Sequence, residues 1–375
     1  MSVKKFVWID AVRIFAVIAV MIDHYLKTFY GHCDFDVVML TLMQFGNLGV
    51  ILFFAISGYL VPSSLERSSS IWEFYRKKLV RIIIPFTVSY ILLGALLLFL
   101  GILNPEFAGR FTGLFFNALY NGTGIEKILL GMLPLELNLV MYFGIPYSLF
   151  VGEWFMGAIV ILFLLAPLLY KCMRRAPIIS LIFSLTISVG IFYAVQDLAA
   201  EGRILNGFWV SVVRIPEFLF GMILFTYKDF FQKHKAKLLI LSEIVIAVLG
   251  TYALIKYGTG GTEFISSPLE RLYPLHPRSF IISFPTIYLF FNAFEYITAN
   301  LPKIFESFLN KFRDISYMVM LIQHVIIYEF ADYFHVENFS GFGMIILFLI
   351  ILMTVIVLSH ELKKFSDPVE KFFMK

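Results

Sequence analysis

Residues 81–103 read RIIIPFTVSYILLGALLLFLGIL, a run of apolar side chains with few polar interruptions. A helix needs about 20 predominantly apolar residues to cross the ~30 Å hydrocarbon core of a bilayer, so this stretch predicts a transmembrane helix. Nine further stretches meet the same requirement. The ten predicted spans lie near residues 6–26, 37–61, 81–103, 153–172, 177–196, 210–227, 238–256, 278–298, 315–335 and 341–361.

The composition of the whole chain supports this prediction. Of its 375 residues 60% are hydrophobic and only 15% are charged, and the mean hydropathy is +0.86. Soluble domains are about half apolar and a quarter charged, so an ordinary soluble or disordered protein is excluded. We therefore expect an all-α polytopic membrane protein, with residues 1–375 forming one bundle of about ten transmembrane helices. The expected location is the cell membrane, namely a bacterial plasma membrane.

The positions of Lys and Arg indicate the orientation, because cytoplasmic loops carry an excess of positive charge. With the N-terminus inside, 21 of the 30 Lys and Arg residues fall in cytoplasmic segments. Both termini are therefore predicted to be cytoplasmic. Residues 104–152 contain apolar runs broken by Pro134, Glu136 and Pro146. A full span there would invert every later segment, so this stretch is predicted to be an extracytoplasmic or interfacial segment of short helices.

Ionisable side chains inside a predicted span are costly, which makes them functional candidates. The first span holds Asp10, Arg13, Asp23 and His24. Arg13 and His24 are 11 residues apart, so they share one helix face about 16 Å apart. Arginine suits phosphate or carboxylate, and histidine suits proton transfer. From the residues alone, a packed histidine bonded to a neighbouring helix explains His24 equally well. Asp23 points about 100° away from His24, so it is not a triad-style partner.

Polar groups in other spans give weaker signals. Ser57 and Gly58 permit close helix packing in the second span. Lys78 and Arg81 lie one helical turn apart at the start of the third span. They are explained equally well as topology determinants beside anionic lipid and as a clamp for phosphate. With two cysteines and no metal or nucleic-acid motif, the sequence predicts no metal site and no nucleic-acid partner.

Taken in order along the chain, these pieces resemble the integral-membrane acyltransferase 3 family. The resemblance covers nearly the whole chain and rests on Trp8 to Arg13 with His24, Phe53 to Leu60, the basic stretch before Pro85, Trp154-Phe155 with Pro167, Arg214 to Phe218 with Gly221, and Ser316-Tyr317 before His324. Family members take an acyl group from cytoplasmic acyl-CoA and pass it to an extracytoplasmic hydroxyl, usually on a glycan or glycolipid.

The resemblance implies roles for individual residues. His24 would be the catalytic general base, with Asp23 as a second catalytic candidate, and Arg13, Lys78 and Arg81 would bind the CoA phosphates. Lys78 stands where relatives carry arginine, which keeps the charge but not a bidentate clamp. The supporting residues would be Asp10, Ser57, Glu153, Trp154, Tyr317 and His324, among which Ser57 and Tyr317 are the candidates to stabilise an oxyanion.

The expected function is therefore that of a membrane O-acyltransferase. Acyl-CoA, with acetyl as the expected group, would be the donor substrate, and a glycan, glycolipid or other hydroxyl compound the acceptor. The esterase-like domain fused to some members is missing, so a separate extracytoplasmic transferase or a homo-oligomer is the expected partner. The alternative is a transporter or flippase of glycan or lipid-linked intermediates, because buried Arg, Asp and His also suit a proton-coupled pathway. No inverted repeat supports it.

Overall fold

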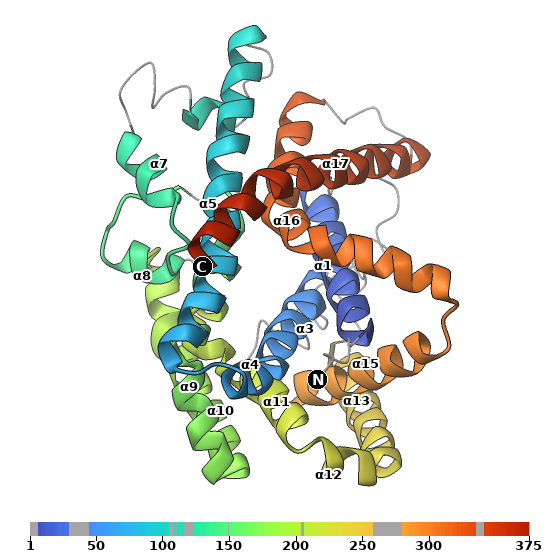
Figure 1. Cartoon of the computed structure of the whole chain (residues 1–375). Coiled ribbons are helices and arrows are strands. Elements are labelled where there is room, and N and C mark those ends of the chain that lie inside the picture. The colour runs from blue at the N-terminus through green and yellow to red at the C-terminus, as the bar shows by residue number, and fades with distance from the viewer. Residues whose placement is uncertain are drawn as a thin grey trace.

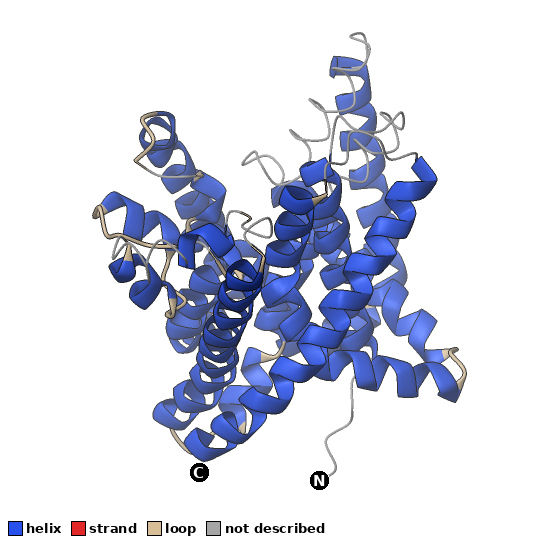
Figure 2. Ribbon diagram, turned by 90° about the horizontal axis from the view of Figure 1, so that it is seen from above, coloured by secondary structure: helices blue, strands red, loops and turns tan. Residues whose placement is uncertain are grey.

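The computed structural model describes residues 7–29, 45–104, 109, 111–115, 124–148, 150–203, 206–257, 280–334 and 341–374. Within these ranges the chain is helical and has no strand (Figure 2). The helices are α1 (Val7–Phe29), α3 (Phe45–Tyr59), α4 (Val61–Glu66), α5 (Ile71–Leu103), α7 (Ile125–Gly131), α8 (Leu137–Tyr142), α9 (Glu153–Arg175), α10 (Pro177–Ala200), α11 (Ile215–Thr226), α12 (Lys228–Lys233), α13 (Lys235–Tyr257), α15 (Phe280–Ala299), α16 (Lys303–Tyr333) and α17 (Gly341–Met374).

Each of the ten predicted spans overlaps one of these helices, so the all-helical class is confirmed. Five segments are long and apolar enough to cross a membrane, namely Phe45–Glu66, Ile71–Leu103, Trp154–Arg175, Pro177–Gln196 and Phe342–Met374. The charged residues of α1 set it apart from these five. The count of ten spans and the cytoplasmic termini stay predictions. So does the side of the membrane on which α7 and α8 lie.

Three helix starts differ clearly from the predicted boundaries. Helix α16 begins at Lys303 rather than near 315, and the other two differences have a local reason. Helix α5 begins ten residues before residue 81, because Ser70 accepts a hydrogen bond from the backbone N–H of Glu73 while the Glu73 carboxylate accepts one from Ser69. This reciprocal arrangement resembles a capping box. Helix α11 begins at Ile215 rather than near 210, because Pro216 fits the first helical turn.

Helix α1 occupies the centre of the bundle and packs along α3 and α16, with α15 beside it. Helix α17 packs on α16, and its C-terminal end reaches α5 (Figure 1). Helices α3 and α11 approach especially closely, because a side chain on Gly58 would overlap the backbone of Phe218 and one on Gly221 would overlap that of Ala55. Small residues at such crossings are typical of membrane bundles.

Candidate active site

A cavity of about 520 Å³ lies beside the C-terminal half of α1. Helices α1, α3, α9 and α16 contribute to its wall, together with the turns that precede α11. The lining residues are Val20, Asp23, His24, Lys27, Gly46, Asn47, Val50, Phe53, Phe111, Gly152, Trp154, Phe155, Asn206, Phe208, Trp209, Arg214, Met320, Gln323, His324 and Tyr328. Four of the predicted site residues, Asp23, His24, Trp154 and His324, therefore meet at one cavity.

His24 contacts α16 directly at this cavity. Its ring nitrogen Nδ1 lies 2.8 Å from Nε2 of Gln323. The His24 ring also meets the His324 ring edge to face, with centroids 6.3 Å apart. Because α1 and α16 pack along each other, the backbones of both helices hold this pair of imidazoles in place. Gln323 lies 299 residues from His24 along the chain, so this contact could not be inferred from the sequence.

Asp23 turns away from the His24 ring, as the 100° helical rotation predicts. Its Oδ2 accepts a hydrogen bond from Nζ of Lys27 at 2.8 Å, one turn further along α1. The carboxylate is buried and lies against Gly46, where any side chain would collide with it. Asp23 therefore balances the charge of Lys27 at the cavity wall.

Arg214 is the second fixed cation in the cavity wall. Its side chain is 2% exposed, and its Nη1 lies 3.3 Å from Oε1 of Glu217, which is fully buried. Its Nε donates a hydrogen bond to the carbonyl of Phe208 at 3.0 Å. The guanidinium also lies 5.4 to 5.8 Å from the ring centres of Phe208, Trp154 and Phe54. These contacts fix a charged donor group in an aromatic setting.

Trp154 belongs to an aromatic platform on the same wall. Its ring is stacked on that of Trp209, with centroids 5.8 Å apart and an interplanar angle of 8°. Asn206, just before Trp209, is held by Asn138, whose Oδ1 accepts the Asn206 backbone N–H at 3.3 Å. Asn138 in turn contacts the buried carboxylate of Glu136, which caps α8. Residues from the 104–152 stretch thus support the cavity wall.

Glu329 on α16 supports the part of the cavity wall that contains Phe111. Its carboxylate accepts hydrogen bonds from the backbone N–H groups of Phe111 and Thr112, at 2.9 and 3.2 Å, and from the Thr112 hydroxyl at 3.0 Å. These bonds tie the short helix at 111–115 to α16. Phe111 is thereby positioned against His324, with ring centroids 6.0 Å apart.

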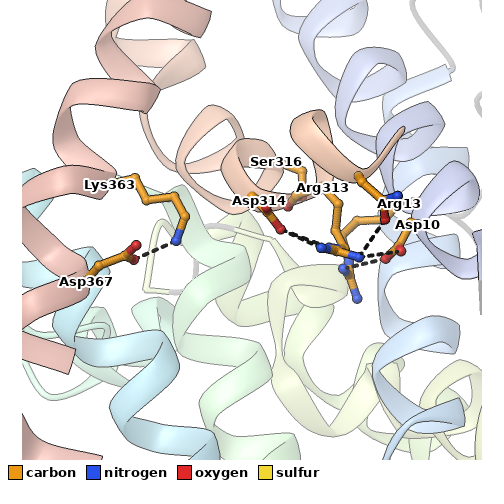
Figure 3. Close-up of polar contacts among 8 residues, drawn as sticks. Asp10, Arg13, Arg313, Asp314, Ser316, Lys363 and Asp367 are labelled. Carbon is orange, nitrogen blue, oxygen red and sulfur yellow. Dashed lines mark hydrogen bonds and ion pairs between the residues drawn. The ribbon is translucent and has the colours of Figure 1, made fainter. Parts of the chain in front are cut away.

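A cluster of cations surrounds the other end of α1 (Figure 3). Asp10 lies between two arginines, 3.4 Å from Nη1 of Arg13 and 3.3 Å from Nη1 of Arg313. Arg313 also pairs with Asp314 at 2.8 Å. Both arginines keep about a quarter of their side chains exposed. The position of Arg313 near Arg13 follows from the packing of α16 on α1.

The predicted pair on α5 joins this cluster. Lys78 lies within electrostatic range of Arg81, Arg13 and Arg67, and its ammonium group sits 5.0 Å from the ring centre of Phe163. Arg81 is more exposed and lies 3.7 Å from Glu370 near the end of α17. The structure therefore brings Lys78 within electrostatic range of Arg13, which lies about 16 Å along α1 from His24, while Arg81 lies one turn from Lys78 on α5.

The two predicted oxyanion stabilisers do not line the cavity. The Tyr317 hydroxyl donates to the carbonyl of Ile82 at 2.9 Å, just before Pro85 in α5. Ser57 makes no side-chain hydrogen bond to any described residue and is half-buried on α3. Glu153 begins α9, but its side chain lies outside the described residues. Arg214 and Gln323 are among the hydrogen-bond donors that do line the cavity.

Within the described ranges, no group of three His, Cys, Asp or Glu side chains is arranged to hold a metal ion. Two ion pairs, Asp23 with Lys27 and Glu217 with Arg214, lie at the cavity wall beside two imidazoles. Imidazole in such a setting can accept and return a proton.

Similarity to known proteins identifies the family of this chain. The family model described as an acyltransferase domain, that of acyltransferase 3, matches residues 6–360. The acyltransferase MdmB of Streptomyces mycarofaciens is 22% identical over 230 residues, which cover 58% of this chain and 56% of that protein. The match thus spans little more than half the length of this relative. No solved structure matches the chain. Since the family model covers nearly all of the sequence, the chain belongs to the acyltransferase 3 family and carries an acyltransferase domain.

Proposed function

We propose that the protein is a multi-pass membrane O-acyltransferase. It moves an acyl group, expected to be acetyl, from cytoplasmic acyl-CoA to a hydroxyl of an extracytoplasmic glycan or glycolipid. The observation that carries this proposal is the placement of His24 in the wall of a cavity of about 520 Å³, on the same helix as the cationic cluster around Arg13. Family membership supports the acyl-transfer chemistry.

The cationic cluster is suited to the donor. CoA carries phosphates, which arginine and lysine bind through charge-assisted hydrogen bonds. Arg13 and Arg313 are balanced by the carboxylates of Asp10 and Asp314, so the net positive charge of the group comes from Lys78. Such a site would hold the polar part of CoA at the bundle end. The acylated arm would then extend along α1 toward His24.

The transfer step needs one base and one returned proton. His24 takes the proton from the acceptor hydroxyl as its oxygen attacks the thioester carbonyl carbon. The new C–O bond forms, the C–S bond breaks, and the imidazolium returns the proton to the departing thiolate. Negative charge develops on the carbonyl oxygen in between, and Arg214 is a fixed donor in the same cavity wall. A covalent acyl-imidazole intermediate would use the same residue.

The composition of the cavity wall supports a sugar acceptor. Seven of its side chains are aromatic, and Trp154 and Trp209 form a flat stacked platform. Aromatic rings offer apolar faces that suit the C–H face of a sugar ring. Asn47, Asn206 and Gln323 add amides, which both donate to and accept from hydroxyl groups.

Substitution of His24 by alanine tests the proposal. Purified wild-type protein is expected to release CoA from acetyl-CoA, and His24→Ala should lower that rate by about 10²–10⁴-fold, the usual contribution of a general base. His360→Ala, on the exposed face of α17, is the matched control and should keep full activity. Wild-type protein that neither binds nor cleaves acetyl-CoA would overturn the proposal in favour of the transporter alternative.

A further inference from the structure

The carboxamide of Gln323 lies within hydrogen-bond distance of the proposed base. Its Nε2 lies 2.8 Å from Nδ1 of His24, and the Gln323 side chain is only 2% exposed. Its Oε1 has no hydrogen-bond partner among the described residues. The Nε2 of this buried amide contacts the imidazole, while its Oε1 has no partner. Rotation of the carboxamide can therefore exchange the atom that faces the ring.

The tautomer of the imidazole decides whether His24 can act as a base. When an amide N–H donates to Nδ1, the ring proton of neutral imidazole sits on Nε2, and Nε2 cannot then accept another proton. When an acceptor faces Nδ1, the proton sits on Nδ1 and Nε2 carries the lone pair. A half-turn of the Gln323 carboxamide exchanges Nε2 for Oε1 at this contact with little change in shape.

We propose that Gln323 is a positioning residue that sets the tautomer of His24, presenting Oε1 to Nδ1–H in the reacting state. This inference rests on the proposed role of His24 as the base. Nε2 of His24 then takes the proton of the acceptor hydroxyl, and the resulting imidazolium keeps its Nδ1–H bond to Oε1 throughout the step. The same contact serves the neutral and the protonated ring, so no rearrangement is needed while the proton is held.

The other charged groups at the cavity already have partners. Asp23 is engaged with Lys27 through Oδ2 at 2.8 Å, and Arg214 with Glu217 at 3.3 Å. The remaining titratable groups in the wall are His324 and Tyr328, both on α16. The ring of His324 meets that of His24 edge to face, with centroids 6.3 Å apart, so the two imidazoles contact each other through their rings.

Two substitutions test whether Gln323 acts as a hydrogen-bond acceptor for His24 or only as a packing contact. Gln323→Met keeps the approximate length of the side chain but removes the acceptor, whereas Gln323→Glu keeps an acceptor and removes the N–H donor. CoA release from acetyl-CoA by the full chain is measured over a range of pH. Gln323→Met should lower kcat by about 10–100-fold, the usual loss for a residue that orients a functional histidine, with KM for acetyl-CoA within twofold of wild type.

Gln323→Glu should retain most of the activity and move the acid limb of the kcat/KM profile to higher pH, because a carboxylate stabilises the imidazolium. Val319→Ala, fully buried one turn away on α16, controls for packing and should keep kcat. Equal loss in Gln323→Met and Gln323→Glu, or no loss in Gln323→Met, would overturn the inference. If Gln323→Met does not fold, an unshifted acid limb in Gln323→Glu overturns it alone.

The His24→Ala variant distinguishes a failure of the proposed function from a failure of the tautomer inference. If His24→Ala is inactive while both Gln323 variants behave as wild type, the proposed function stands and the tautomer inference fails. If His24→Ala retains full activity, the proposed mechanism itself fails.

Discussion

Gly58→Ala tests how the bundle positions its cavity. The two helices that cross at this point are α3 and α11. A Cβ atom at Gly58 would lie 2.7 Å from the carbonyl carbon of Phe218 and 3.1 Å from its Cα, and closer still to the carbonyl oxygen. These are backbone atoms, which cannot rotate away as a side chain would. Gly221 makes the reciprocal contact, so neither helix can slide to relieve the overlap.

The expected cost follows from these distances. Carbon atoms in contact prefer a separation of about 3.5–4.0 Å, so α11 would have to withdraw by about 1 Å. Overpacking of this kind costs about 1–3 kcal/mol, from which the better helix propensity of alanine recovers about 1 kcal/mol. The substitution should therefore destabilise the protein by up to about 2 kcal/mol. Because Arg214 directly precedes α11 and Phe53 lies on α3, the cavity wall shifts as well. A displacement near 1 Å can lower a rate by about 10²-fold.

Thermal unfolding of purified protein, followed by tryptophan fluorescence, measures the first effect, and CoA release from acetyl-CoA measures the second. Gly190→Ala on α10 is the matched control, because nothing lies within 4 Å of a Cβ at that position. It should leave the unfolding temperature unchanged or raise it slightly. If Gly58→Ala and Gly190→Ala unfold at the same temperature and are equally active, the close crossing of α3 and α11 is wrong.

Three further predictions concern buried carboxylates. Arg214→Met or Glu217→Gln should each cost about 3–5 kcal/mol by leaving one partner of a buried pair, whereas the double variant should lose less than the sum; thermal unfolding of all three checks this, and strict additivity would contradict it. Glu329→Gln should weaken the charge-assisted bonds to Thr112 and the adjacent backbone, worth about 1.5–3 kcal/mol each, and speed limited proteolysis at 109–115. Burial raises the pKa of Glu136 above its ordinary 4.5, so its contribution to stability is present below that pH and is lost as pH rises through the folded-state pKa; the unfolding temperature of Glu136→Gln should therefore fall less between pH 5 and 8 than that of wild type.

The apolar runs of the sequence were sufficient to locate the helices but not their ends. Every predicted span overlaps a helix because hydrophobic length is a property of the local sequence. Helices α5 and α17 extend well beyond their apolar runs, to Ile71 and Met374. The start of α5 was predictable, since Ser70 and Glu73 have capping-box spacing. The end of α17 was not, because its polar last turns are stabilised by packing near Arg81.

Helical periodicity also placed Arg13 and His24 on one face, which needs only the geometry of a single helix. The contacts that give each residue its setting come from distant parts of the chain. Arg313 reaches Asp10 across 303 residues, and Gln323 reaches His24 across 299. Both partners lie on α16, so the packing of α16 on α1 positions both ends of the site. Sequence spacing carries no record of that packing, and the supporting residues were therefore missed.

The interior of α1 bears on how the two ends communicate. Residues 14–22 read IFAVIAVMI and contain no polar side chain, so α1 offers no hydrogen-bonding relay between Arg13 and His24. An isolated charge or a lone proton would cross such a stretch only at high cost. If the cationic end and the imidazole end act in one reaction, as proposed, the substrate itself must connect them. A donor with a charged head and a long uncharged arm satisfies that requirement, because its charge stays with the arginines while its reactive carbonyl enters the cavity. The apolar stretch at residues 14–22 therefore favours the transferase over a proton-coupled transporter, which would need polar groups along that interval.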